Sequence, residues 1–125
     1  MSRRPSENEV RLILTLVGSG FDEIETVRKQ LSSATVAELD NGSILEFHAL
    51  VSEPLLVKEK VLGEGSLRDI DGTPIIFTLL QKDGYIWRLD ISRADSGRIH
   101  RQLDYDAVVS LGFGNGLSLA WPNGE

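Results

Sequence analysis

The sequence contains no cysteine, which excludes disulfide bonds, zinc sites built on thiolates and cysteine nucleophiles. A chain without cysteine suits a reducing cytosol. Long apolar runs are also missing, because the densest run covers only residues 12–17 and a membrane-spanning helix needs about 20 residues. The residues after Met1 are charged and lead into no apolar stretch, so we expect no signal peptide and a soluble, cytoplasmic protein.

Histidine is scarce as well, since only His48 and His100 are present. Neither a His-x₃-His nor a His-Glu-x-x-His spacing occurs, so a zinc site would need carboxylates to complete its ligand set. His48 shares its predicted strand face with Glu46, which gives two candidate ligands, but histidine sites normally recruit a third spaced ligand. We therefore predict no metal and no cofactor.

Acidic residues outnumber basic ones by 19 to 13, which gives a formal net charge of −6. This balance argues against binding to nucleic acid, which requires clustered lysine and arginine. Residues 22–71 hold eleven acidic and five basic side chains, 5 − 11 = −6, whereas residues 88–101 hold four arginines and two aspartates, 4 − 2 = +2. Both segments are compatible with solvated faces, and an electrostatic partner of the first half is expected to be basic.

Two helices are predicted near the N-terminus. Ser6 and Glu9 have the spacing of a capping box, and the apolar residues that follow them recur at helical intervals. These residues are Val10, Ile13, Leu14 and Val17. Gly18 and Gly20 are expected to end this helix. A second helix is predicted over residues 22–31, because acidic side chains lie in its first turn and basic ones near its end. Its inward side chains would be Phe21, Ile24, Val27 and Leu31.

After residue 33 the apolar residues recur at every second position, which is typical of strands. Residues 35–39 and 43–50 flank Asp40-Asn41-Gly42, and this sequence favours a hairpin because asparagine and glycine tolerate positive φ. One face of this hairpin is predicted to carry Ala37, Leu39, Leu45 and Phe47, and the other Glu38, Glu46 and His48. A strand over residues 55–62, a turn at Gly63-Glu64-Gly65 and a short strand over residues 66–70 are expected to follow.

The clearest hairpin joins residues 75–81 to residues 85–91 around Asp83-Gly84. A two-residue turn would pair Leu80 with Trp87, Thr78 with Leu89 and Ile76 with Ile91, and place all six side chains on one face. The other face would carry Phe77, Leu79 and Ile86 among Arg88 and Asp90. Residues 98–103 and 105–111 suit either strand or helix, a turn is expected over residues 112–116, and residues 117–121 resemble a last edge strand.

These elements predict an α+β fold in a single domain that covers residues 1–125. Two N-terminal helices would pack on one face of a twisted antiparallel sheet of four to six strands, because the short connections disfavour a parallel sheet. A chain of this length buries about 65–70% of its surface on folding, which is enough for a core of its own.

Few motifs in the sequence are typical of catalysis or of binding to a metal or a phosphate. Asp69-Ile70-Asp71-Gly72 is a fragment of a calcium loop that lacks the third acid and the distal glutamate, and the alternative is that its aspartates cap the turn. Gly63-Glu64-Gly65-Ser66 lacks the Gly-Lys-Ser ending of a phosphate loop. No serine lies in a Gly-x-Ser-x-Gly motif. We therefore predict no catalytic residues and a protein that is not an enzyme.

Turn residues between positions 36 and 95 carry a resemblance to a known family. The relevant segments are Val36-Ala37-Glu38-Leu39-Asp40-Asn41-Gly42-Ser43, Asp69-x-Asp71-Gly72, Asp83-Gly84, Leu89-Asp90-Ile91 and Asp95. They resemble a family of small uncharacterised bacterial proteins in which an Asp-Asp-Gly turn precedes an Asp-Gly hairpin and a Glu-Leu-Asp-Ile-Trp strand. Asn41 and Ser92 depart from that pattern. The resemblance implies an α+β domain and assigns no catalytic residue.

The first functional hypothesis is a non-enzymatic acidic binding protein, because the chain combines a negative charge with no catalytic constellation. Its sharpest form is a bacterial immunity protein that neutralises a toxin, since a compact anionic protein would be steered rapidly to a basic toxin domain. The partner would then be a protein. The acidic residues predicted to contact it are Glu38, Glu46, Glu64, Asp69 and Asp71.

The second hypothesis is a small pocket enzyme or a ligand-binding domain that uses the concavity of the sheet. The first residues to test would be Tyr85, Trp87, Arg88 and Asp90. An Arg88–Asp90 pair on the surface is the alternative interpretation of two of them. A third hypothesis is an assembly subunit that pairs through edge strands such as residues 117–121. For the chain as a whole we expect a monomer or a homodimer.

Overall fold

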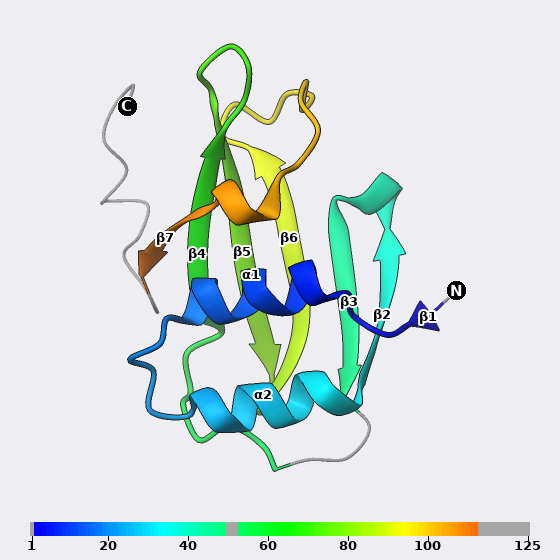
Figure 1. The fold of residues 1–125 in the computed structure, drawn as a ribbon, viewed down its shortest axis with the longest axis vertical. Helices are drawn as coiled ribbons and strands as arrows, with labels where there is room; N and C mark the ends of the chain where they lie inside the picture. Colours follow the sequence, from blue (N-terminus) through cyan, green and yellow to red (C-terminus); the bar gives the residue numbers. More distant parts are fainter. Residues whose placement is uncertain (1, 50–52, 113–125) are drawn as a thin grey trace.

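A computed structural model describes residues 2–49 and 53–112 of the chain (Figure 1). The elements in chain order are β1 (Ser2–Arg3), α1 (Glu7–Val17), α2 (Ile24–Ser33), β2 (Ala34–Leu39), η1 (Asp40–Gly42), β3 (Ile44–Ala49), β4 (Val61–Arg68), β5 (Pro74–Lys82), β6 (Tyr85–Arg93), η2 (Tyr105–Ala107) and β7 (Val109–Gly112). The seven strands form one antiparallel sheet in the order β1-β2-β3-β6-β5-β4-β7. The α+β fold is therefore confirmed, with one strand more than the predicted maximum.

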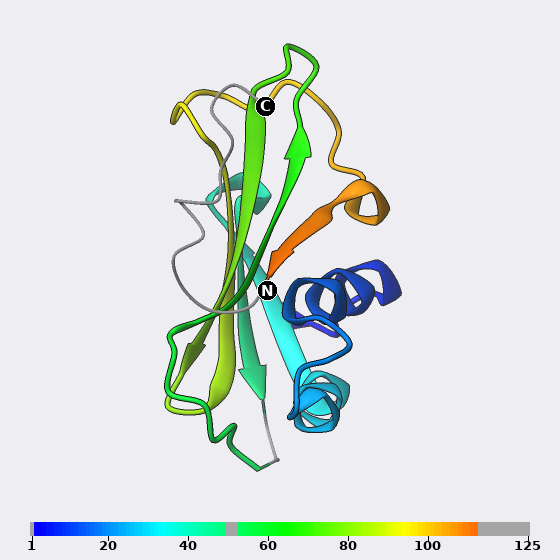
Figure 2. The same cartoon turned by 90° about the vertical axis from the view of Figure 1, so that its left-hand side faces the viewer.

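Both helices run across one face of the sheet, and no described helix covers the opposite face (Figure 2). The space between helices and sheet is filled with apolar side chains from both layers. Its largest fully buried members include Phe77, Leu12, Ile13, Leu16, Leu45, Leu62, Ile75, Leu79, Ile86 and Leu89. We call the helix-covered side the inner face and the opposite side the outer face.

The N-terminal helices largely follow the predicted pattern. The Ser6 hydroxyl accepts a hydrogen bond from the Glu9 amide, and the Glu9 carboxylate accepts one from the Ser6 amide, so the capping box is confirmed. The second helix begins and ends two residues later than predicted. The Glu23 side chain makes no capping hydrogen bond to its own helix and reaches a different segment instead.

The first long hairpin forms as predicted around residues 40–42, where all three residues adopt positive φ. The assignment of its faces was wrong for β2. Val36 pairs with Phe47, and Glu38 pairs with Leu45, so Val36 is buried and Ala37 and Leu39 lie on the outer face. The error arises because a one-residue change of register exchanges the two faces of a strand. Glu38 therefore lies on the inner side, at the edge of the sheet, whereas Glu46 and His48 lie on the outer face.

The second long hairpin has the predicted turn but not the predicted pairing. Asp83 and Gly84 both have positive φ, and Lys82 pairs with Tyr85. Gln81 then pairs with Ile86 but Leu80 with Arg88, which leaves Trp87 as the extra residue of a β-bulge. Beyond the bulge every pair is displaced by one residue. From the sequence we expected a helix to cover the face that carries Leu80, Thr78 and Ile76, which is wrong. That face is the outer one, and Ile75, Phe77 and Leu79 lie in the core.

The strand expected over residues 55–62 forms only at residues 61–62, and the turn expected at residues 63–65 does not form. Residues 53–60 form no regular element, and β4 runs continuously from Val61 to Arg68 through both glycines, with the predicted short strand as its end. A Cβ at Gly63 would lie 2.1 Å from the carbonyl oxygen of Leu16. Glycine at this position lets α1 pack directly against the backbone of β4, which is a contact no other residue permits.

The C-terminal part of the described chain is mostly irregular. Residues 98–103 form neither helix nor strand, and residues 105–112 form η2 followed by β7. The predicted turn at residues 112–116 and the predicted strand at residues 117–121 lie largely or wholly outside the described residues.

Candidate functional site

Residues 53–60, which we call the strap, pass between the start of α2 and the turn of the β5–β6 hairpin. The Leu55 amide donates a 2.7 Å hydrogen bond to the Gly84 carbonyl, and the Gln81 amide donates one of 2.8 Å to the Lys60 carbonyl. Gly84 has a φ of +89°, and a Cβ there would lie 2.6 Å from the Cβ of Pro54. The hairpin turn thus requires glycine for its conformation and for contact with the strap.

A buried glutamine in α2 fastens the strap to the hairpin. The Gln30 side-chain Nε2 donates to the carbonyls of Glu53 and Gly84, at 2.9 Å each, and its Oε1 accepts from the Ile86 amide at 2.9 Å. Gln30 is fully buried. A buried amide is stable only when its donors and acceptor are satisfied, and these three bonds use both ends of the group.

A second buried glutamine in β5 holds the other half of the strap. Gln81 Nε2 donates to the carbonyls of Val57 and Glu59, at 2.7 and 2.8 Å, while its Oε1 accepts from the Gly84 amide at 2.7 Å. Gln81 and Gln30 together therefore give the strap a defined path although it contains no regular hydrogen-bonded ladder. In the sequence these two glutamines are isolated and 51 residues apart, 81 − 30 = 51, and no local pattern reveals that they meet at this place.

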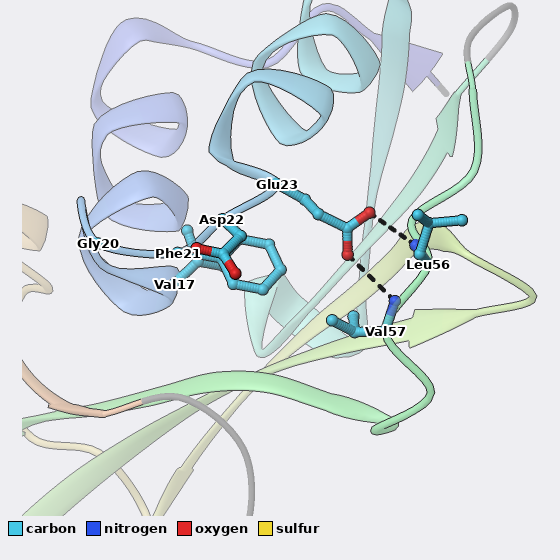
Figure 3. Close-up of a pocket in the computed structure, with 7 residues that line it drawn as sticks. All are labelled: Val17, Gly20, Phe21, Asp22, Glu23, Leu56 and Val57. Carbon is cyan, nitrogen blue, oxygen red and sulfur yellow. Dashed lines mark hydrogen bonds between the residues drawn. The ribbon is translucent and has the colours of Figure 1, made fainter.

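The Glu23 carboxylate, at the start of α2, also holds the strap. It accepts hydrogen bonds from the amides of Leu56, at 2.7 Å, and Val57, at 3.1 Å (Figure 3). A first hollow of about 640 Å³ lies beside this contact. The residues that line it are Val17, Gly20, Phe21, Asp22, Glu23, Leu56 and Val57. The Glu23 carboxylate is occupied by two backbone amides, Asp22 is exposed, and the other lining residues are glycine or apolar.

A second hollow, of about 800 Å³, shares Leu56 and Val57 with the first and is also lined by the turn of the β5–β6 hairpin. Its lining consists of Pro54, Leu55, Leu56, Val57, Lys58, Lys60, Gln81, Lys82, Asp83, Gly84 and Trp87. The Lys82 ammonium lies 5.4 Å from the centre of the Trp87 ring, and the Arg88 guanidinium lies 5.2 Å from it. Three lysines and one aspartate give this lining a formal charge of 3 − 1 = +2.

The four residues of the predicted pocket do not surround one cavity. Trp87 lines the second hollow. Arg88 and Asp90 form a 2.7 Å ion pair on the outer face, where both side chains are partly exposed. Tyr85 begins β6, half-buried, and does not line any of the hollows described here. The cavity expected in the concavity of the sheet is replaced by the apolar core in the described part of the molecule.

The five predicted contact acids are dispersed over the molecule. Glu46 and Glu64 lie on the outer face, where Glu46 is 3.6 Å from the His48 ring and Glu64 accepts a 3.2 Å hydrogen bond from the Thr78 hydroxyl. Glu38 is exposed at the β1–β2 edge and forms a 2.8 Å ion pair with Arg3, which also binds Glu9. The remaining two, Asp69 and Asp71, lie in the β4–β5 loop.

Three aspartates at the loop end of the sheet are held together by one arginine, which the sequence did not single out. Arg93 is buried, and its guanidinium contacts Asp69 at 2.9 Å, Asp71 at 3.1 Å and Asp95 at 2.7 Å. The Asp69 side chain has no exposed surface and also accepts a 2.8 Å hydrogen bond from the His100 amide. Asp69 is thus unavailable for direct contact with a partner, and the calcium-loop fragment binds a guanidinium instead.

The charges around Arg93 alter the acidity of all three carboxyls. Burial alone would raise the pKa of Asp69, but the amides of His100 and Ile70 and the Arg93 guanidinium lower it below the usual value. The pKa of Asp71 is lowered by the Thr73 amide and by Arg93. The pKa of Asp95 is also lowered, first by Arg93 and then by the Gly97 amide. This cluster is an ion-pair network that joins the β4–β5 loop to the end of β6.

Within residues 2–49 and 53–112, no group of three or more histidine, aspartate or glutamate side chains is placed to hold a metal ion. In the same residues, no helix has the length and apolar character needed to cross a membrane. In this part of the chain, the His48 imidazole lies 3.6 Å from one carboxylate, that of Glu46.

Comparisons with known proteins identify a family for this chain. A family described as a domain of unknown function, DUF6984, matches residues 2–103 and so covers most of the chain. No curated protein and no solved structure matches it. The match agrees with the resemblance to an uncharacterised family that the sequence indicated, and it assigns no residue a role.

Proposed function

The chain belongs to the DUF6984 family, and we propose that it is a non-enzymatic protein-binding domain whose partner carries a basic surface. The binding surface is the outer face of the sheet. One observation carries this proposal: three carboxylates, those of Glu46, Glu64 and Asp90, lie on the side of the sheet that no described helix covers. They come from β3, β4 and β6.

The outer face combines these charges with apolar surface. Strand pairing aligns Glu64, Thr78, Asp90 and Ile44 in one row across β4, β5, β6 and β3. The neighbouring row places Leu80 beside Arg88 and Glu46. All of these side chains are half-buried. A rigid surface of mixed apolar and charged side chains is suited to protein recognition, because the apolar part supplies affinity and the charges supply steering.

The ionisable groups near the hollows support binding rather than catalysis. Those that line the first two hollows are Asp22, Glu23, Lys58, Lys60, Lys82 and Asp83, and each is exposed or half-exposed. The carboxylates that are buried, Glu9 and Asp69, are paired with arginines and line no hollow described here. Catalytic acids and bases require a desolvated group that faces a substrate, and the described residues supply no such group.

The sharpest form of the proposal is a bacterial immunity protein that neutralises a toxin in the cytoplasm. Toxins that cleave nucleic acid carry basic surfaces, and the net charge of −6 would accelerate their capture. Of the five acids chosen from the sequence, Glu46 and Glu64 are the two that we retain as direct contacts. Asp90 joins them because of its position in the sheet.

Binding to the product of the gene next to this one tests the proposal. Both proteins are purified, and their affinity is measured by titration calorimetry at low and at high salt. We expect a one-to-one complex that weakens as salt is added, because salt screens the opposite charges. The absence of binding to any neighbouring gene product, or an affinity independent of salt, would contradict the proposal.

The second candidate is a ligand-binding domain, in keeping with the alternative derived from the sequence. One observation favours it, namely the second hollow with its lysines and Trp87. This hollow lies beside the strap and outside the sheet concavity, so the proposed ligand site differs from the predicted one.

A further inference from the structure

The lining of the second hollow differs in charge from the rest of the molecule. Lys58, Lys60 and Lys82 converge there with only Asp83 to oppose them, in a chain whose net charge is −6. Among the described residues, no carboxylate forms an ion pair with any of these three lysines. Glu59 lies between two of them in sequence but does not line the hollow. Three ammonium groups that have no anionic partner in the described part of the chain favour an anionic ligand.

The apolar part of the hollow is built by the bulge in β6. Trp87 is the extra residue of that bulge, and without it Trp87 would pair with Leu80 in the regular ladder. Bulges often redirect a side chain next to a binding site. Here the indole lines the same hollow as the strap residues Leu55, Leu56 and Val57. The site can therefore hold an apolar or planar group as well as an anion.

The wall formed by the strap is held in place before any ligand binds. The side chains of Gln30, Gln81 and Glu23 make seven of the hydrogen bonds that position the strap and the adjoining turn. A preformed wall lowers the entropic cost of binding. A volume of about 800 Å³ lies within the range of small-molecule sites, about 300–1,000 Å³.

From these observations we propose that the second hollow binds a small organic phosphate of nucleotide size. Its phosphate groups contact Lys58, Lys60 and Lys82, and its planar apolar part contacts Trp87 and the strap. This site is separate from the outer-face contacts at Glu46 and Glu64, so the two proposals succeed or fail independently. Lysine provides point charges suited to phosphate, and indole provides surface suited to a ring.

The fluorescence of Trp87 tests the proposal. In a Trp121→Phe background Trp87 is the sole tryptophan, and the titrants are ATP, AMP, adenosine, pyrophosphate and inorganic phosphate. We expect a saturable change with ATP and AMP, because an anion that draws Lys82 away from the indole alters its surroundings. Adenosine should bind at least tenfold more weakly than AMP, on the order of 1.4 kcal/mol. Pyrophosphate should bind more weakly than ATP.

The double variant Lys58→Ala/Lys60→Ala should weaken AMP binding about tenfold or more, whereas Lys29→Ala, on α2 and outside the hollow, should not. All these lysines are exposed, so circular dichroism should show each variant folded. The proposal is overturned by no saturable change with ATP or AMP, or by equal binding to both lysine variants. Equal affinity for AMP and adenosine, or for ATP and pyrophosphate, would also overturn it.

Discussion

Gln30 in α2 donates a hydrogen bond from its side-chain Nε2 to the carbonyl oxygen of Gly84, 54 residues further along the chain, at 2.9 Å. The same amide binds the Glu53 carbonyl and accepts from the Ile86 amide. One buried side chain thereby joins a helix, the strap and a hairpin turn. The position of both hollows beside the strap depends on this contact.

Replacing Gln30 with leucine should destabilise the protein by about 3 kcal/mol, because leucine leaves the buried Ile86 amide without its acceptor and removes the buried hydrogen bond to the Gly84 carbonyl. Urea unfolding measures this change. Gln102→Leu is the matched control, since Gln102 is exposed, and it should alter stability by less than about 0.5 kcal/mol. A similar small effect of both variants would show that the Gln30 network does not hold the strap.

Gly63→Ala should destabilise the protein by at least about 2 kcal/mol, because the new Cβ would lie 2.1 Å from the Leu16 carbonyl oxygen and force α1 away from β4. The control is Gly20→Ala, where a Cβ meets no atom within 4 Å. Thermal unfolding of the two variants checks the prediction. Equal melting temperatures would rule out the close contact of α1 with β4.

The ion pairs of Arg93 with Asp69, Asp71 and Asp95 should make the free energy of unfolding depend on pH. The pKa values of Asp69, Asp71 and Asp95 are lower in the folded chain than in the unfolded chain, so their contribution is complete above the unfolded value of about 3.9. It is lost as the pH falls below that value and the carboxylates take up protons. The stability difference between wild type and Arg93→Gln should thus be largest at neutral pH and shrink in acid.

Urea unfolding at several pH values between neutral and acid measures that difference. Arg98→Gln serves as the control, because Arg98 is exposed and forms no ion pair with any described residue. Its effect should be small and independent of pH. A difference for Arg93→Gln that stays constant across this pH range would contradict the assigned network.

Glu23→Gln should loosen the strap without unfolding the protein. The carboxylate accepts from the amides of both Leu56 and Val57, and a neutral side chain retains only one acceptor oxygen. Hydrogen exchange at these two amides should quicken about tenfold, while exchange in β5 stays unchanged. Glu25→Gln is the control, because Glu25 is exposed and pairs only with Arg28 among the described residues. Unchanged exchange in Glu23→Gln would exclude its role in holding the strap.

Local signals predicted a large part of the fold. The capping box at Ser6 and Glu9 and the turns at residues 40–42 and 83–84 were all confirmed, because each depends on residues that are close in sequence. The face assignments failed where the pattern depended on register. Trp87 looks like an ordinary member of an alternating strand, and only the three-dimensional pairing reveals it as a bulge.

The candidate site was harder to predict than the fold. The side chains that hold the strap are those of Gln30 and Gln81, two polar residues that belong to no motif and whose partners are distant in sequence. Gly63 looked like a turn residue, whereas its role is to let a helix approach a strand. Asp69 looked like a surface acid because the sequence does not show that Arg93 comes to lie against it. Long-range contacts decide each of these outcomes.

The most direct test of the proposed function is the affinity of the neighbouring gene product for Glu46→Lys/Glu64→Lys. Titration calorimetry compares this variant with Glu7→Lys/Glu25→Lys, which makes the same change of charge on the helices. We predict that the outer-face variant binds about a hundredfold or more weakly, whereas the helix variant stays within a few-fold of wild type. Equal losses in the two variants, or no loss in the first, would contradict recognition through the outer face.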